Sequence, residues 1–169
     1  INDYNIQLLY EHQIEGLHWF LEQHSFGRGS LLGDEMGLGK TIQTIALLCY
    51  VMEHKQNFGP FLVVVPLGTL TNWKLEFEKW APLIKKVIYK GTPQERKEMA
   101  AFLRNNRFNV CLTTYEYVLK DKSELNRFHW QYIIVDEGHK MKNPKSQFAM
   151  TLGQVYNSEH RLLLTGTPL

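Results

Sequence analysis

The chain has 169 residues, which is about the length of one domain and enough to bury a sizeable core. Hydrophobic residues make up 44% of it and charged residues 21%, a composition typical of a folded globular protein and not of a disordered one. The formal net charge of +2 gives no argument for nucleic-acid binding from bulk charge, so any such function must depend on local residues.

The residue pattern also argues against membrane and zinc proteins. No apolar run approaches the length of a membrane span and the amino terminus has no signal-peptide layout, so we expect no membrane partner. Cys49 and Cys111 show no metal-ligand spacing, and we expect both to pack as small apolar groups, which points to a reducing compartment. The seven histidines are scattered without a cysteine partner nearby, so no structural zinc is predicted.

The first part of the chain predicts a helix, a strand and a buried helix, in that order. Apolar residues at helical spacing predict the first helix over residues 11–24. A short apolar run predicts a strand at 30–33. The next helix is expected from Lys40 to about His54, and we expect it to be buried because it is apolar on most sides.

The segment between that strand and that helix, residues 33–41, reads GDEMGLGKT. Gly37 and Gly39 lack a Cβ atom, so successive backbone N–H groups can turn toward phosphate oxygens, and the helix N-terminus adds partial positive charge. Lys40 would then reach the β- and γ-phosphates of a nucleotide, and the Thr41 hydroxyl would bind Mg²⁺. The sequence therefore predicts a phosphate-binding loop.

One residue departs from the general phosphate-loop pattern. Asp34 stands where G-x-x-x-x-G-K-[ST] has its first glycine. Taken alone, the segment could also be a polar loop between a strand and a helix, so a second motif has to decide.

The middle of the chain predicts alternating strands and helices. Continuous apolar runs are typical of strands covered on both faces, and Gly and Pro mark their ends. The expected elements are a strand at 61–65, a helix capped by Thr69 and ending near Trp80, a strand at 86–89, a charged helix from Pro93 to about Asn105, a strand at 109–113, a short helix or turn from Tyr115, a loop, and a strand at 131–135.

The second motif follows the strand at 131–135, which ends in Asp136 and Glu137. In a phosphate-loop nucleotidase the first acid holds Mg²⁺ and the second polarises the attacking water, so Asp136 and Glu137 are candidates for those roles. The alternative is a solvated strand end, because acidic residues after strands are common. The upstream Lys40 loop favours the catalytic interpretation.

The last part of the chain predicts a helix from Pro144 to about Tyr156 and a strand at 162–164. Strands that alternate with helices indicate crossover connections, and hence an α/β fold with a mainly parallel sheet and helices on both faces. Both nucleotide motifs follow a strand, where such sheets bind their ligands. Trp73, Trp80 and Trp130 are expected to pack in or near the core and not to stack on bases, because no interleaved aromatic and basic stripe is present.

The order of the short motifs resembles that of a superfamily 2 helicase-type motor. The matching segments are DEMGLGKT at 34–41, VVVPLGTLTNW at 63–73, LTTYEYV at 112–118, DEGH at 136–139 and LLLTGTPL at 162–169. The variant with Asp34 and Glu35 is similar to that of the SWI/SNF-type chromatin-remodelling ATPases. Gly138, YEYVLKDK at 115–122 and EFEKWAP at 76–82 most resemble the Brahma-type catalytic subunits.

This resemblance implies a fold, an activity and partners. Residues 1–169 would form the first RecA-like lobe of a P-loop NTPase, without the second lobe that closes over the nucleotide and supplies an arginine. The intact motor would hydrolyse ATP with Mg²⁺, translocate on double-stranded DNA and remodel nucleosomes in the nucleus as part of a larger complex. The lobe alone would bind nucleotide weakly and hydrolyse it very slowly.

The resemblance also implies roles for individual residues. Gln13 would recognise adenine, since its amide can donate and accept at once. Thr165, Gly166 and Thr167 would form motif III, which links the nucleotide site to the DNA face; alone, they would be a turn after a strand. The predicted nucleotide-binding residues are Gln13, Asp34, Gly37, Leu38, Gly39, Lys40 and Thr41.

The candidate DNA contacts are the loops after the second and fourth strands and a segment after DEGH. Backbone N–H groups, hydroxyls and a few lysines on a row of phosphates give a grip that is independent of sequence. The alternative for Lys140 and Lys142 is an ordinary solvated loop. The predicted contact residues are Pro66, Thr69, Asn72, Thr114, Lys142 and Asn143.

Three other functions are compatible with parts of this pattern. A strand-separating RNA or DNA helicase would share the same lobe. A nucleotide-gated binding module would need the phosphate loop, but the pairing of Asp136 with Glu137 argues against it because a pure binder needs no water-activating carboxylate. A histone-binding module has little support in a chain without an acidic tract.

Overall fold

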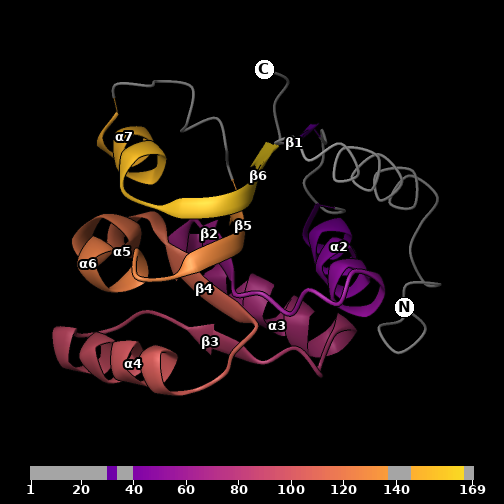
Figure 1. Cartoon of the computed structure of the whole chain (residues 1–169), viewed down its shortest axis with the longest axis horizontal. Coiled ribbons are helices and arrows are strands. Elements are labelled where there is room, and N and C mark those ends of the chain that lie inside the picture. The colour runs from indigo at the N-terminus through magenta and orange to yellow at the C-terminus, as the bar shows by residue number, and fades with distance from the viewer. Residues whose placement is uncertain (1–29, 34–39, 137–145, 166–169) are drawn as a thin grey trace.

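The computed structural model describes residues 30–33, 40–136 and 146–165 (Figure 1). Within these ranges six strands form one sheet in the order β1-β6-β5-β2-β4-β3, and every neighbouring pair is parallel. The strands are β1 (Ser30–Gly33), β2 (Phe61–Val65), β3 (Lys86–Ile88), β4 (Val110–Thr114), β5 (His129–Val135) and β6 (Asn157–Thr165). The predicted α/β fold with a parallel sheet is confirmed.

The helices that connect these strands cover both faces of the sheet (Figure 1). They are α2 (Lys40–His54), the 3-10 turn η3 (Leu67–Thr69), α3 (Leu70–Trp80), α4 (Pro93–Asn105), α5 (Tyr115–Lys120), α6 (Lys122–Leu125) and α7 (Gln147–Gln154). The helix predicted over residues 11–24 lies outside the described residues.

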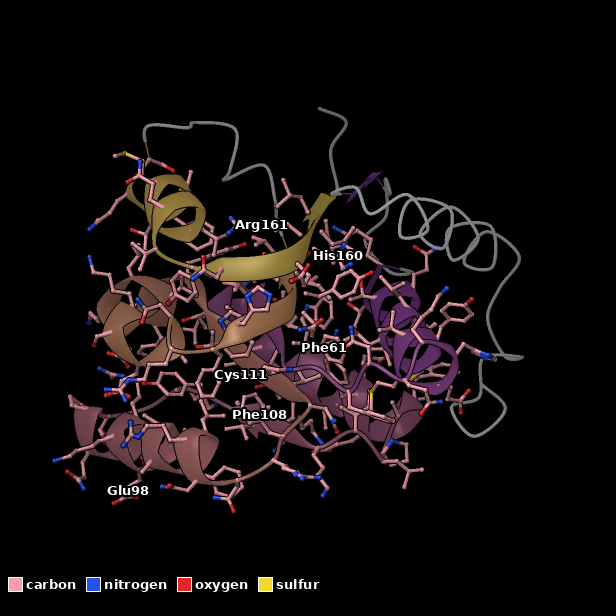
Figure 2. All side chains as sticks on the ribbon, in the orientation of Figure 1. Phe61, Glu98, Phe108, Cys111, His160 and Arg161 are labelled. Atoms are coloured by element: carbon pink, nitrogen blue, oxygen red, sulfur yellow. The ribbon has the colours of Figure 1, made fainter. Side chains whose placement is uncertain are left out.

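The central strand β2 shows why the apolar runs are continuous. Phe61, Val63 and Val65 pack in one core cluster with α2 and α3, whereas Leu62 and Val64 pack in a second cluster with α4 to α7. All five side chains are fully buried, because a parallel strand covered on both faces has no solvent side. Phe61, which is labelled in Figure 2, is the first residue of this strand.

Both cysteines and two of the tryptophans lie in this core, as predicted. Cys49 and Cys111 are free and buried, and burial raises the pKa of the Cys49 thiol to about 12. Trp73 and Trp130 are each at most 1% exposed. Among the described residues, no helix is both long enough and apolar enough to cross a bilayer.

Strand β6 begins earlier than predicted. The hydropathy pattern predicts only residues 162–164, but the strand starts at Asn157, which pairs with His129 of β5. The added residues are polar, and they include His160 and Arg161, which project from β6 in Figure 2. Backbone pairing with a central strand extends the element where the hydrophobic pattern gives no signal.

The helix starts show two different uses of threonine. Thr69 precedes α3 as predicted, but its side chain forms no cap; its hydroxyl donates to the Pro66 carbonyl at 3.0 Å. Thr92 instead forms a capping box, in which Thr92 Oγ1 accepts from the Glu95 N–H and Glu95 accepts from the Thr92 N–H. The difference arises because Thr69 lies in the η3 turn, with helical and not extended backbone angles.

Two further elements differ from the prediction. Residues Lys122–Leu125 form α6 where a loop was expected, and the buried Leu125 anchors this short helix to the core. Helix α7 begins at Gln147, later than predicted, because the extended Ser146 caps it by accepting from the Ala149 N–H at 3.1 Å. Pro144, the predicted start of that helix, lies outside the described residues.

Candidate nucleotide-binding site

The candidate site lies at the carboxyl edge of the sheet, where β5 ends and α2 begins. Asp136 directly follows β5, and its N–H donates to the Val64 carbonyl of the neighbouring β2 at 2.8 Å. The pairing between these strands therefore holds the Asp136 backbone in place. Lys40 is the first residue of α2.

Lys40 and Asp136 meet at this edge. Lys40 Nζ lies 3.6 Å from Asp136 Oδ1, and the two residues are only 4% and 7% exposed. Buried charges are costly unless they are paired, so each residue compensates the other. The structure thus brings together the two motifs on which the sequence interpretation depends.

Two aromatic residues also hold Asp136. The Trp73 indole Nε1–H of α3 donates to Asp136 Oδ2 at 3.0 Å. The Tyr115 hydroxyl, at the start of α5, donates to the Asp136 carbonyl oxygen. The acid is therefore fixed through its main chain and through both carboxylate oxygens.

The donor atoms fit a nucleotide with Mg²⁺. Thr41, the second residue of α2, is 9% exposed and supplies a hydroxyl, while Asp136 supplies a carboxylate. Mg²⁺ binds such oxygen donors and takes its remaining ligands from water and substrate phosphates. Thr41 and Asp136 would hold the metal, and the Lys40 ammonium at the helix N-terminus would bind phosphate.

Among residues 40–136 and 146–164, no group of three or more acidic, histidine or cysteine side chains is placed to hold a metal ion. A magnesium ion shared with phosphates does not need one, because one or two protein oxygens suffice. The donor set therefore suits a metal that arrives with its substrate.

Several predicted site residues fall outside the described residues. For nucleotide binding and catalysis these are Gln13, Asp34, Gly37, Leu38, Gly39 and Glu137, and for nucleic acid they are Lys140, Lys142 and Asn143. Their roles stay predictions.

The predicted DNA-contacting residues that the structure describes lie at the same edge of the sheet. Pro66, Thr69 and Asn72 follow β2, and Thr114 ends β4 beside Val65 in the register of the two strands. Asn72 is exposed, whereas Thr114 is 4% exposed. The two predicted loops therefore leave adjacent strands, and their contact with nucleic acid stays a prediction.

The contacts of Trp73 and Tyr115 with Asp136 are not predicted by the sequence motifs, although Tyr115 lies in the candidate DNA-contacting loop after the fourth strand. The sequence indicates only that Trp73 packs in the core, which the structure confirms. A signal was available, because a buried indole N–H needs an acceptor and Trp73 directly follows a predicted contact residue. Nothing in the local sequence identifies Asp136 as that acceptor.

We predict that the Lys40–Asp136 pair contributes strongly to the stability of the nucleotide-free protein. A Lys40→Met change leaves the Asp136 carboxylate buried without its cation, and the free energy of unfolding should fall by about 3 kcal/mol. Adding Asp136→Asn should recover part of this loss, because no buried charge then remains. Denaturant unfolding of the two single variants and the double variant measures the coupling.

The matched control is the exposed pair formed by Lys120 and Glu116 on α5. Its N···O distance of 2.7 Å is shorter, but its side chains are 59% and 53% exposed. Lys120→Met should change the stability by no more than about 0.5 kcal/mol. Equal effects of the two lysine substitutions would show that burial does not strengthen the Lys40 pair.

Comparison with known proteins shows the family to which this arrangement belongs. A family model described as the SNF2-related domain matches residues 12–169. The chain is 53% identical over 161 residues both to the SWI/SNF chromatin-remodeling complex subunit snf22 of Schizosaccharomyces pombe and to the ATP-dependent helicase brm of Drosophila melanogaster. Each match covers 95% of this chain and 10% of the relative.

A solved structure has the same fold. The Sulfolobus solfataricus SWI2/SNF2 ATPase core, in complex with double-stranded DNA, matches with a TM-score of 0.84 and 35% identity over 99% of this chain. The likeness confirms the predicted RecA-like lobe. The chain spans 34% of that structure and about a tenth of the two curated relatives.

Proposed function

The chain belongs to the SNF2-related domain family, and from this premise we propose that it is the first, ATP-binding lobe of a motor that translocates on double-stranded DNA and remodels chromatin. The observation that carries the proposal is the buried contact between Lys40 and Asp136, at 3.6 Å. Phosphate-loop hydrolases need a lysine for the phosphates and an acid for the metal at one position, and this contact supports both roles.

The residues divide the work of ATP hydrolysis. The Lys40 ammonium moves from Asp136 to the β- and γ-phosphates when the nucleotide enters, so the lysine always has an anionic partner. Thr41 and Asp136 hold Mg²⁺, which when bound neutralises phosphate charge. Glu137 accepts the proton of the attacking water, and Gln13 recognises the adenine edge.

The DNA-contacting surface is proposed at the loops that follow β2 and β4. Pro66, Thr69 and Asn72 approach one strand of the duplex together with the segment around Thr114. The parallel register between Val65 and Thr114 supports this, because it sets the two loops side by side. Lys142 and Asn143 would extend the contact along the phosphates.

The cellular setting is part of the same proposal. One of the relatives, snf22, is named as a subunit of a SWI/SNF chromatin-remodeling complex. We therefore place the full-length protein in the nucleus, in a complex of this kind, acting on nucleosomes by sliding or eviction. A second motor lobe of the same protein would close over the nucleotide.

The decisive experiment is ATP hydrolysis by a longer protein that carries this chain and the second lobe. The rate is measured alone, with duplex DNA and with RNA, and with Lys40→Ala as the control. Stimulation by duplex DNA that disappears in the lysine variant is the expected result. Stimulation by RNA alone would favour the helicase alternative, and nucleotide binding without turnover would favour the gated binding module.

A further inference from the structure

Asp136 has an unusually complete set of contacts for a residue that is expected to bind a metal. Its N–H donates to Val64, its carbonyl accepts from Tyr115, Oδ2 accepts from Trp73, and Oδ1 faces Lys40. These partners come from four different elements, so the position of the acid depends on the packing of the whole carboxyl edge.

The two carboxylate oxygens have different partners. Oδ2 accepts a hydrogen bond from the indole, which is a donor only and is directional. Oδ1 lies 3.6 Å from the ammonium nitrogen of Lys40. Rotation of the carboxylate would break the hydrogen bond from the indole. Trp73 therefore keeps Oδ1 directed toward the start of α2, where Lys40 and Thr41 lie.

Trp73 is itself held firmly. It is 1% exposed and packs with Phe77 of the same helix at a ring-centroid distance of 6.3 Å. It lies one residue after the exposed Asn72, in the first turn of α3. Tyr115 has the equivalent place after Thr114, and its ring meets Phe148 of α7 edge to face, with centroids 4.9 Å apart.

We propose that Trp73 and Tyr115 are positioning residues for Asp136: the indole orients its carboxylate, and the phenol fixes its main chain. This inference depends on the proposed function, because it assigns Asp136 to Mg²⁺. Hydrogen bonds from outside the ligand set commonly fix a metal ligand's orientation, and their loss costs about 10- to 100-fold in metal affinity or activity. Trp73 follows Asn72 and Tyr115 follows Thr114, so each residue also connects a proposed DNA contact to the nucleotide site.

The test uses nucleotide binding by the longer protein with both lobes. The affinity for a fluorescent, non-hydrolysable ATP analogue is titrated in EDTA and in Mg²⁺ for the wild type and for Trp73→Phe, which removes the N–H donor. The gain in affinity produced by Mg²⁺ should fall about tenfold, while the affinity in EDTA should stay unchanged. A purely structural role of Trp73 would lower both affinities together.

Trp80→Phe is the matched control. It removes an indole from the same helix. The Nε1–H of that indole donates to Glu76 at 2.8 Å and not to Asp136. The Mg²⁺-dependent gain should remain that of the wild type. Thermal unfolding verifies that each variant is folded, and Tyr115→Phe, which should lower the gain in the same direction, decides the matter if Trp73→Phe is unfolded.

The outcomes separate the inference from the function it depends on. A wild type that binds no nucleotide, or a Lys40→Ala variant that binds as well as wild type, would reject the proposed function and the inference with it. Mg²⁺-dependent binding by the wild type that folded Trp73→Phe and Tyr115→Phe keep in full would overturn only the inference. Equal losses in EDTA and in Mg²⁺ would also overturn it.

Discussion

A polypeptide limited to residues 1–169 is expected to hydrolyse ATP about 10³- to 10⁵-fold more slowly than a protein that also carries the second motor lobe. The described site is one-sided, because Lys40, Thr41 and Asp136 all lie at one edge of one sheet. The transferred phosphoryl group carries charge on its outer oxygens in the transition state. In the proposed motor, an arginine of the second lobe stabilises that charge.

The measurement compares DNA-saturated turnover by the two proteins at saturating MgATP. Lys40→Ala in each protein gives the background rate, so that a slow true rate is not confused with a contaminating ATPase. Nucleotide affinity is titrated separately, because weak binding alone would raise KM without lowering the rate at saturation. DNA-stimulated turnover by residues 1–169 at the rate of the longer protein would show that the first lobe contains a complete catalytic site.

The sheet and the meeting of the two motifs could be predicted from the sequence for physical reasons. A run such as Phe61–Val65 is apolar at every position because both faces of β2 are covered, and its length marks it as a strand. Lys40 and Asp136 both follow strands, and the carboxyl ends of parallel strands share one edge. Their proximity therefore follows from topology, without knowledge of the side-chain packing.

The missed features depend on contacts distant in the sequence. The first half of β6 is polar, and only its pairing with β5 from His129 onward makes it a strand. The Trp73 indole was correctly predicted to pack in the core, but its hydrogen-bond acceptor is Asp136, which follows strand β5 and is distant from α3 in the sequence. Hydrophobic patterns predict which side chains are buried, whereas the partner of a buried donor depends on how helix α3 lies against the sheet.

In the longer protein, Glu137→Gln is expected to reduce ATP hydrolysis by about 10²- to 10⁴-fold while nucleotide affinity stays close to that of the wild type. Glutamine keeps the size and the hydrogen-bonding shape of the side chain, but its amide cannot accept a proton from the attacking water. Single-turnover hydrolysis and equilibrium binding of ATP with Mg²⁺ measure the two properties separately.

Asp136→Asn is the informative comparison because it changes the neighbouring acid in the same way. Asp136 contacts Lys40 and accepts from Trp73, so its neutral variant should weaken Mg²⁺-dependent binding as well as turnover. The two variants should therefore behave differently. Glu137→Gln should bind ATP without hydrolysing it, whereas Asp136→Asn should lose both Mg²⁺-dependent binding and hydrolysis. If Glu137→Gln also lost nucleotide binding, Glu137 would have a structural role in the site, and another residue would have to accept the proton of the attacking water.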